Sequence, residues 1–172
     1  NSHNYGAIEV KDVTTRNANI GGVVALSKGS ISSCENSGAL NINCDIPYRS
    51  AVYGDYKEYA IGGVVGIATG STNTIVGCNN NAKGSITISG EIYNQNPDSG
   101  YHGIGGVVGV LKSLVESSQN DAPIYVELTT YFFDDGTTNN AANAGLYIGG
   151  AAGSVLLTNY NKQTLNNNGD IT

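Results

Sequence analysis

The sequence has few charged residues, few cysteines, no methionine and no long apolar run. Only 13% of its 172 residues are charged, and eight Lys or Arg against fourteen Asp or Glu give a net charge of −6. An acidic chain lacks the basic surface that nucleic acids require, and anionic lipids repel it. No segment reaches the roughly 18 apolar residues of a membrane-spanning helix. We therefore expect neither nucleic-acid binding nor direct membrane insertion.

The chain begins at Asn1 and contains no signal peptide. We interpret it as an internal or mature fragment from which any targeting sequence has been removed. At 40% apolar content it is too apolar and too weakly charged to be a disordered chain.

The number and spacing of the three cysteines, Cys34, Cys44 and Cys78, argue against a disulfide framework and a zinc site. An odd number argues against a disulfide framework, although one pair stays open. No two have the spacing of a zinc site, and only His3 and His102 are available to join them. We expect small buried cysteines, no metal site and no cofactor.

Glycine is abundant, at 24 residues, and much of it lies in a repeat. An Ile-Gly-Gly string recurs at positions 20, 61, 104 and 148, at offsets of 41, 43 and 44 residues. Periods in this range are typical of solenoids, propellers or arrays. A glycine pair at one place in each repeat allows backbones to approach closely, so that successive turns stack without a side-chain clash. The repeated glycines are Gly21, Gly22, Gly62, Gly63, Gly105, Gly106, Gly149 and Gly150.

Asparagine recurs at one turn of each repeat, where its tolerance of left-handed backbone is useful. Stacked asparagine side chains also hydrogen-bond from one rung of a sheet to the next. The matching asparagines are Asn4, Asn36, Asn80, Asn120 and Asn168.

Other positions of the repeat predict short strands. Cys34, Cys78 and Ser118 share one position, which predicts a small inward-facing stack. Apolar and polar residues alternate in segments such as 39–42 and 85–88, as in half-buried strands. Val110–Glu116 has helical potential, but its alignment with the other repeats favours a strand.

The second repeat, Gly62 to Gly90, carries Gly-Gly-Val-Val-Gly, then Ile-x-x-Cys-x-Asn and Gly-x-Ile-x-Ile. This pattern resembles the GLUG repeat of bacterial surface proteins. The third and fourth repeats lack the cysteine, and the fourth has Ala151-Ala152 in place of Val-Val. The resemblance implies right-handed β-helical segments of secreted adhesins, or non-catalytic regions of bacterial peptidases, and an extracellular or cell-surface location. It carries over no catalytic residue.

The fold expected from the repeat is all-β. We predict one domain over residues 1–172, a right-handed parallel β-solenoid of about four repeats of 41–44 residues. The pattern leaves open whether each repeat forms one coil or two, and a β-sandwich is the alternative fold. The sequence shows no polar cap, so we interpret the domain as part of a longer array with flanking repeats of the same polypeptide as neighbours.

Three insertions interrupt the array, each before an Ile-Gly-Gly string, and we expect them to emerge on one side. They run Asp45–Ala60, Glu91–Gly103 and Thr129–Tyr147, and they hold ten of the thirteen aromatic residues. Tyrosines beside polar groups suit a glycan or a host protein. In the alternative interpretation they pack the insertions onto the solenoid as β-hairpins, with 128–133 pairing 145–148. The candidate ligand-binding residues are Tyr53, Tyr56, Tyr59, Tyr93, Tyr101, Tyr131 and Phe133.

Evidence for catalysis or calcium binding is weak. Asp134-Asp135-Gly136, and Asp55 with Glu58, offer oxygen ligands but match no calcium-binding loop, and Asp-Asp-Gly is typical of a turn. The same carboxylates are the available pair for glycoside cleavage. We expect no enzyme. The leading hypothesis is an adhesin-like surface module that binds glycan or host protein, the second a structural stalk, and the third a polysaccharide-active β-helix enzyme.

Overall fold

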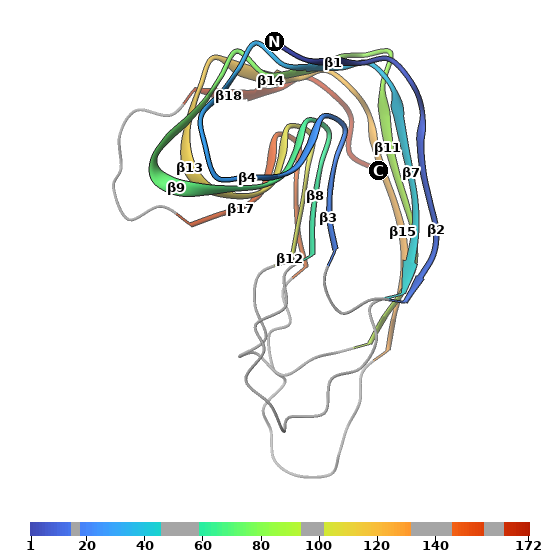
Figure 1. The fold of residues 1–172 in the computed structure, drawn as a ribbon. Helices are drawn as coiled ribbons and strands as arrows, with labels where there is room; N and C mark the ends of the chain where they lie inside the picture. The colour runs from blue at the N-terminus through green and yellow to red at the C-terminus, as the bar shows by residue number, and fades with distance from the viewer. Residues whose placement is uncertain (15–17, 46–58, 94–101, 132–145, 157–163) are drawn as a thin grey trace, which may run out of the picture.

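The computed structural model describes residues 1–14, 18–45, 59–93, 102–131, 146–156 and 164–172. These residues form eighteen short strands and no helix, which confirms the all-β class (Figure 1). It follows that the described part of the chain contains no helix long and apolar enough to cross a membrane. The strand pairings are parallel throughout, whereas β-sandwiches are built from antiparallel sheets.

The strands form four parallel sheets, here named A to D in the order in which the chain visits them. Sheet A contains β1 (His3–Asn4), β6 (Glu35–Asn36), β10 (Asn79–Asn80), β14 (Ser118–Asn120) and β18 (Leu165–Asn167). Sheet B contains β2 (Ile8–Thr14), β7 (Ala39–Asp45), β11 (Ser85–Tyr93) and β15 (Ile124–Tyr131). Sheet C contains β3 (Ala18–Gly21), β8 (Tyr59–Gly62), β12 (His102–Gly105) and β16 (Leu146–Gly149). Sheet D contains β4 (Val24–Ser27), β9 (Val65–Val76), β13 (Val108–Glu116) and β17 (Ala152–Val155), and β5 (Ile31–Ser32) also pairs with β9.

The pairing register follows the sequence repeat. Ile20, Ile61, Ile104 and Ile148 are paired in a row across sheet C. The second and third repeats each contribute one strand to each sheet, and the first also contributes β5 to sheet D. One pass of the chain through the sheets is here called a coil. Val110–Glu116 lies within β13, so the expected strand is confirmed there. β15 pairs with β11 and β16 with β12, so the predicted hairpin between segments 128–133 and 145–148 is not formed by the described residues.

Two large apolar clusters form most of the core, and a small third one contains Ala60, Ile67 and Val110. One gathers isoleucines and leucines from sheets B and C, which face one another in Figure 1, and its centre includes Ile61, Ile86 and Ile104. The other lines the inside of sheet D and its turn toward sheet A, and it includes Val64 and Leu111. These side chains are 0–3% exposed. Burying each one stabilises the fold by roughly 1.5–3 kcal/mol.

A row of asparagine side chains runs through the interior along sheet A. The amide Nδ2 of each residue donates to Oδ1 of the next, at 2.8–2.9 Å. The three inner residues are fully buried. This asparagine ladder consists of Asn4, Asn36, Asn80, Asn120 and Asn167.

The ladder confirms four of the five predicted asparagines and corrects the last. Asn167, and not Asn168, accepts from Asn120. Three asparagines in a row at 166–168 gave no basis for choosing among them. Asn168 lies one residue further on and donates to Asp121 at 2.8 Å.

The ladder side chains also shape the turn from sheet A to sheet B. Asn36 Nδ2 donates to the carbonyl of Gly38 at 2.9 Å, and the amide of Gly38 donates to Asn36 Oδ1 at 3.3 Å. Asn120 and Asn167 make the same bond to the carbonyl two residues on. Asparagine suits this position because its short amide mimics the backbone of a turn.

The glycine pairs are required by close backbone approach, as predicted. A Cβ on Gly63 would lie 2.0 Å from the carbonyl oxygen of Gly106 and 2.4 Å from Asn80 Nδ2. A Cβ on Gly62 would lie 1.9 Å from the carbonyl oxygen of Val65 within the same bend. The first glycine therefore permits the bend between sheets C and D, and the second leaves room for the asparagine ladder.

The cysteine position is a buried corner between sheets D and A. Cys34 and Cys78 are free and buried, and Ser118 is buried beside them, which confirms the predicted small stack. The residue before each has a left-handed backbone, with φ of 52° at Ser33 and 59° at Gly77. The side chain of Cys44 lies outside the described part of the structure.

Replacement of Asn80 by alanine is expected to destabilise the fold by roughly 2–4 kcal/mol. The substitution removes the acceptor of one N–H of Asn36 Nδ2 and the Asn80 donor to Asn120 Oδ1, and each buried group left unpaired costs about 1–3 kcal/mol. Urea unfolding followed by circular dichroism measures the change. Asn79→Ala, on the outward side of the same strand, is the control and should change stability by less than about 0.5 kcal/mol. Equal effects of the two substitutions would contradict the role given to the ladder.

Gly63→Ala is expected to destabilise the fold by about 4 kcal/mol or more, because its methyl group would overlap a backbone carbonyl that cannot move away. Gly29→Ala is the matched control, since a Cβ there would meet nothing within 4 Å. Thermal unfolding of the two variants is compared with that of the parent chain. A Gly63→Ala protein as stable as Gly29→Ala would show that the bend does not need glycine.

Candidate functional site

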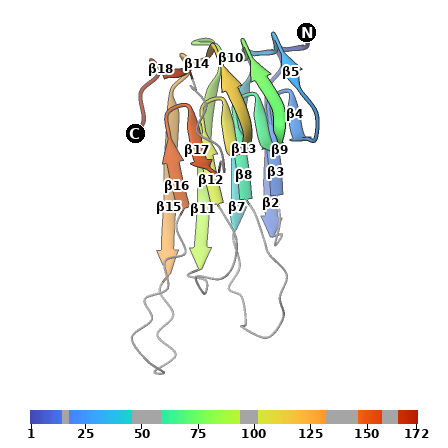
Figure 2. The same ribbon diagram turned by 90° about the vertical axis from the view of Figure 1, so that its left-hand side faces the viewer.

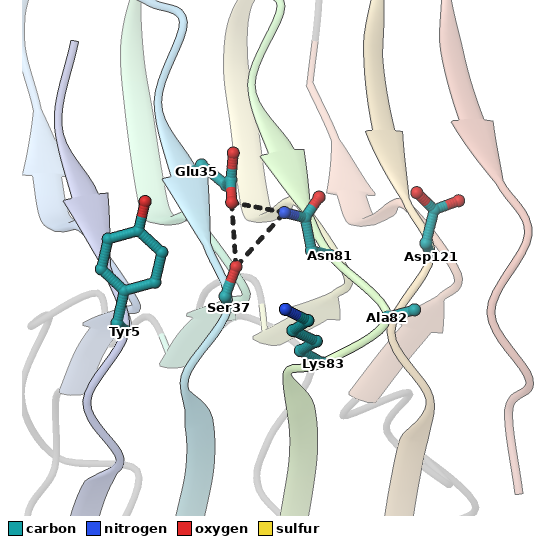
Figure 3. A pocket seen from close by; sticks show the side chains of 7 residues that line it. All are labelled: Tyr5, Glu35, Ser37, Asn81, Ala82, Lys83 and Asp121. Atoms are coloured by element: carbon teal, nitrogen blue, oxygen red, sulfur yellow. Dashed lines mark hydrogen bonds between the residues drawn. The ribbon is translucent and has the colours of Figure 1, made fainter.

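An open groove of about 380 Å³ lies at the outer corner between sheets A and B (Figure 3). Its residues come from four successive coils of the stack. They are Tyr5, Glu35, Ser37, Asn81, Ala82, Lys83 and Asp121.

The asparagine ladder positions most of this groove. Tyr5, Ser37, Asn81 and Asp121 each follow directly after a ladder asparagine. The ladder asparagine is the last residue of its strand and points inward, and the residue after it lines the outer surface. The four side chains consequently form a row across the coils on the outer surface.

A longer turn in the third coil forms one side of the groove. Two residues separate Asn36 from Ala39, the first residue of β7, but four separate Asn80 from Ser85, which pairs with Ala39. The extra residues are accommodated at Ala82 and Lys83, and the amide of Gly84 donates to the carbonyl of Asn81 at 2.8 Å to close the turn.

One coil lies between the two sides of the groove, which are formed by Tyr5 and Lys83. Tyr5 lies in the first coil, Lys83 in the third, and Ser37 between them in the second. Neighbouring strands are about 4.8 Å apart, so the two sides are separated by about 9.6 Å.

Polar side chains at the base of the groove hold one another in place. Glu35 Oε1 accepts hydrogen bonds from Ser37 Oγ, at 2.9 Å, and from Asn81 Nδ2. Asn81 Nδ2 also lies 3.2 Å from Ser37 Oγ. His3 Nδ1 is 3.6 Å from Glu35 Oε2. The carboxylate is thus oriented before any ligand arrives, which lowers the entropic cost of binding.

The carboxylate of Asp121 is held in a similar way at the far end. Gln119 Nε2 donates to both of its oxygens, at 2.7 and 2.8 Å, and Asn168 Nδ2 donates to Oδ1 at 2.8 Å. Both acidic groups of the groove therefore serve as fixed hydrogen-bond acceptors.

Tyr5 and Lys83 are the accessible groups of the groove. The ring of Tyr5 is 72% exposed and stacks on His3, with centroids 6.0 Å apart and planes at 6°. Lys83 is exposed, and none of the ion pairs among the described residues involves it. An aromatic ring, an ammonium group, a hydroxyl and oriented carboxylates together suit a polyhydroxylated ring with an apolar face.

The predicted aromatic residues are only partly described. Tyr53, Tyr56, Tyr101 and Phe133 lie outside the described residues. Tyr93 and Tyr131 are paired in register near the ends of β11 and β15, and their side chains lie outside the description.

Tyr59 differs from the prediction. It is the first residue of β8, its side chain is 2% exposed, and its ring lies 5.5 Å from that of His102. Its backbone amide donates to His102 Nδ1 at 3.2 Å. Tyr59 therefore packs in the core, which contradicts the ligand-contacting role predicted for it.

The insertions connect sheet B to sheet C in each of three repeats. Strands β7, β11 and β15 run side by side to one edge of sheet B, as Figure 2 shows. Sheet C begins at the same edge, with β8, β12 and β16 in register. The three insertions therefore start from neighbouring strand ends on one side of the molecule.

The carboxylates considered for calcium or catalysis, Asp55, Glu58, Asp134 and Asp135, lie outside the described residues. Among the residues that the structure does describe, no three His, Cys, Asp or Glu side chains converge as metal ligands would. His102, which the sequence offered only as a possible companion of the cysteines at a metal site, is buried at 5% exposure beside Tyr59.

No protein-family model, curated protein or solved structure matches this chain.

One thiol of the buried corner has a perturbed acidity. Burial raises the pKa of Cys78, and this outweighs the backbone hydrogen bonds of Cys34 and Val76, which lower it. A thiol with a raised pKa forms little thiolate, so it is a poor nucleophile. Cys78 is thus a structural residue and not a reactive one.

The raised pKa predicts a stability loss at alkaline pH. Below the ordinary thiol pKa of 9.0, Cys78 is neutral in both folded and unfolded states, and its contribution is complete. As pH rises above that value the unfolded state loses the proton more readily, so the contribution falls. The difference in unfolding free energy between the parent chain and Cys78→Ser should therefore shrink as the pH rises above 9.0 in urea titrations. Serine is a fitting control because Ser118 occupies the equivalent position. A difference that does not change with pH would contradict the assignment.

Proposed function

We propose that this chain is a non-catalytic, carbohydrate-binding surface module built as a right-handed parallel β-solenoid. The groove between Tyr5 and Lys83 is the observation that carries the proposal, because it combines an exposed aromatic ring with oriented polar groups. A solenoid is supported by the register of the strands, in which equivalent positions of successive repeats pair in parallel in each of the four sheets.

The size of the groove favours a single sugar ring. A sugar ring in van der Waals contact with the ring of Tyr5 lies about 4 Å from it. The sugar then lies above Ser37, in the gap of about 9.6 Å between the strands that carry Tyr5 and Lys83. The hydroxyl groups of the sugar then face Asn81 and Lys83 on the opposite side. The rest of a glycan chain extends into solvent, because the groove is open.

The wider biological setting is part of the same proposal. The likeness of Gly62 to Gly90 to the GLUG repeat supports an extracellular bacterial surface protein of the adhesin type. The aromatic residues of the three insertions are a second candidate surface, and they suit a glycan or a host protein.

A structural stalk is the second candidate function. The unbroken asparagine ladder and the two continuous apolar clusters favour it, because they make a rigid, extendable stack. A polysaccharide-active enzyme has less support. Glu35 and Asp121 are two coils apart, and each is hydrogen-bonded to neighbouring side chains.

Binding to a broad glycan array tests the proposal. We expect selective binding by the parent chain and a loss of about tenfold or more for Tyr5→Ala, since burying apolar surface of this size contributes roughly 1.5–3 kcal/mol. Tyr125→Ala is the matched control. That tyrosine is 46% exposed on the outer face of sheet B, away from the groove, and its removal should leave binding unchanged.

A triple variant, Tyr53→Ala with Tyr56→Ala and Tyr131→Ala, separates the groove from the insertions. Binding retained by the triple variant and lost by Tyr5→Ala locates the glycan in the groove. The reverse result places it on the insertions and overturns the role given to the groove. No binding by any form favours the stalk.

A further inference from the structure

The groove between sheets A and B has charges of opposite sign at its two ends. Glu35 pairs with Asn79 of the next coil, and Lys83 lies four residues beyond Asn79 along the chain. Figure 3 shows Glu35 on one side of Ser37 and Asn81, and the ammonium group of Lys83 on the other side. The groove is therefore polarised along the direction of the strands.

These two charges do not neutralise one another. Lys83 is exposed, and its ammonium group has no ion-pair or hydrogen-bond partner among the described residues. Glu35 Oε2 is 3.6 Å from His3 Nδ1, which is too long for a hydrogen bond. That oxygen retains its capacity to accept, and the side chain of Glu35 is 30% exposed. Both charged groups are therefore available to a ligand.

The two charges lie on inner coils of the stack. Glu35 is on β6, which lies between β1 and β10 in sheet A. Lys83 follows β10, which lies between β6 and β14. Each of these coils has a described coil on both sides, so the placement of both charges is set by strands that the structure describes.

A ligand with charge of one sign only is disfavoured in this groove. Glu35 and Asp121 supply two carboxylates against the one ammonium group of Lys83, on a chain of net charge −6. This excess repels a sugar that carries only a carboxylate. A sugar that carries only an ammonium group is attracted to Glu35 but is repelled by Lys83. A sugar with one group at each end of its ring matches both ends of the groove.

We propose that the groove selects a zwitterionic sugar, with an ammonium group that binds Glu35 and a carboxylate that binds Lys83. The ring of the sugar stacks on Tyr5 as in the proposed function, on which this inference rests. An ammonium group is a donor only and a carboxylate is an acceptor only, so each fits one end of the groove. Charge-assisted hydrogen bonds are also stronger than those between neutral groups. Glu35 and Lys83 are thus the specificity-determining residues.

The methyl glycosides of four related sugars test the proposal: glucose, glucosamine, glucuronic acid and 2-amino-2-deoxyglucuronic acid. The last has its ammonium group on C2 and its carboxylate on C5, at opposite ends of the ring. Their affinities for the intact chain are measured by NMR titration at about pH 6.5, where such amines are protonated and the carboxylates are ionised. We expect the zwitterion to bind about fivefold more tightly than each of the other three, because an exposed ion pair contributes about this factor.

Variants of the two charged residues assign the preference to the groove. Glu35→Gln should remove the gain that the ammonium group provides, and Lys83→Gln should remove the gain from the carboxylate. Lys83→Arg keeps the charge and should keep the preference. Glu127→Gln and Lys28→Gln are the matched controls, because they make the same charge changes at exposed positions outside the groove. Circular dichroism shows whether the variants are folded, and about 1 M salt should reduce the preference by screening.

The outcomes separate this inference from the proposed function. Equal affinities of all four sugars, each reduced by Tyr5→Ala, would overturn the charge selection but leave the groove as a sugar-binding site. A preference for the zwitterion that neither Glu35→Gln nor Lys83→Gln changes would place that sugar elsewhere and would also overturn the inference. No saturable binding of any of the four up to about 10 mM would overturn the proposed function together with the inference.

Discussion

The hydrogen bonds between buried asparagine amides are the interaction on which the rest of this structure depends. Each inner residue, such as Asn80, has both its donor and its acceptor satisfied by identical residues in the coils before and after it. A shift of one residue between coils would leave these buried groups unpaired, at a cost of roughly 1–3 kcal/mol each. The ladder therefore sets the register of sheet A, and through the connecting turns it also sets that of the other sheets.

The glycine pairs are the second half of the same arrangement. Gly63 faces Asn80 so closely that no Cβ fits between them, and the same holds for Gly106 and Asn120. Asparagine and glycine thus recur together because each occupies space that the other must leave free. The groove follows from this geometry as well, since the residue after each ladder asparagine is directed outward to solvent, as Tyr5 is.

Much of the fold was predictable because stacking imposes the same demand on equivalent positions of every repeat. The glycine pairs, four of the five ladder asparagines and the buried cysteine position all carry that repetition. Asn167 was missed because its neighbour Asn168 satisfies the pattern equally well. The groove was missed because Tyr5 and Lys83 depart from the repeat, and the only signal was a turn two residues longer than its equivalents. Tyr59 was assigned to an insertion because the clustering of aromatic residues does not indicate at which residue the next strand, β8, begins.

Hydrogen exchange of side-chain amides, measured by NMR, tests the ladder most directly. If the amides of Asn36, Asn80 and Asn120 are bonded to one another in the core, their protons should exchange as slowly as buried backbone amides, through global unfolding. The side-chain amide of Asn41, which is exposed on the outer face of sheet B, is the reference for free exchange. Exchange of the Asn80 amide at the rate of the Asn41 amide would contradict the account.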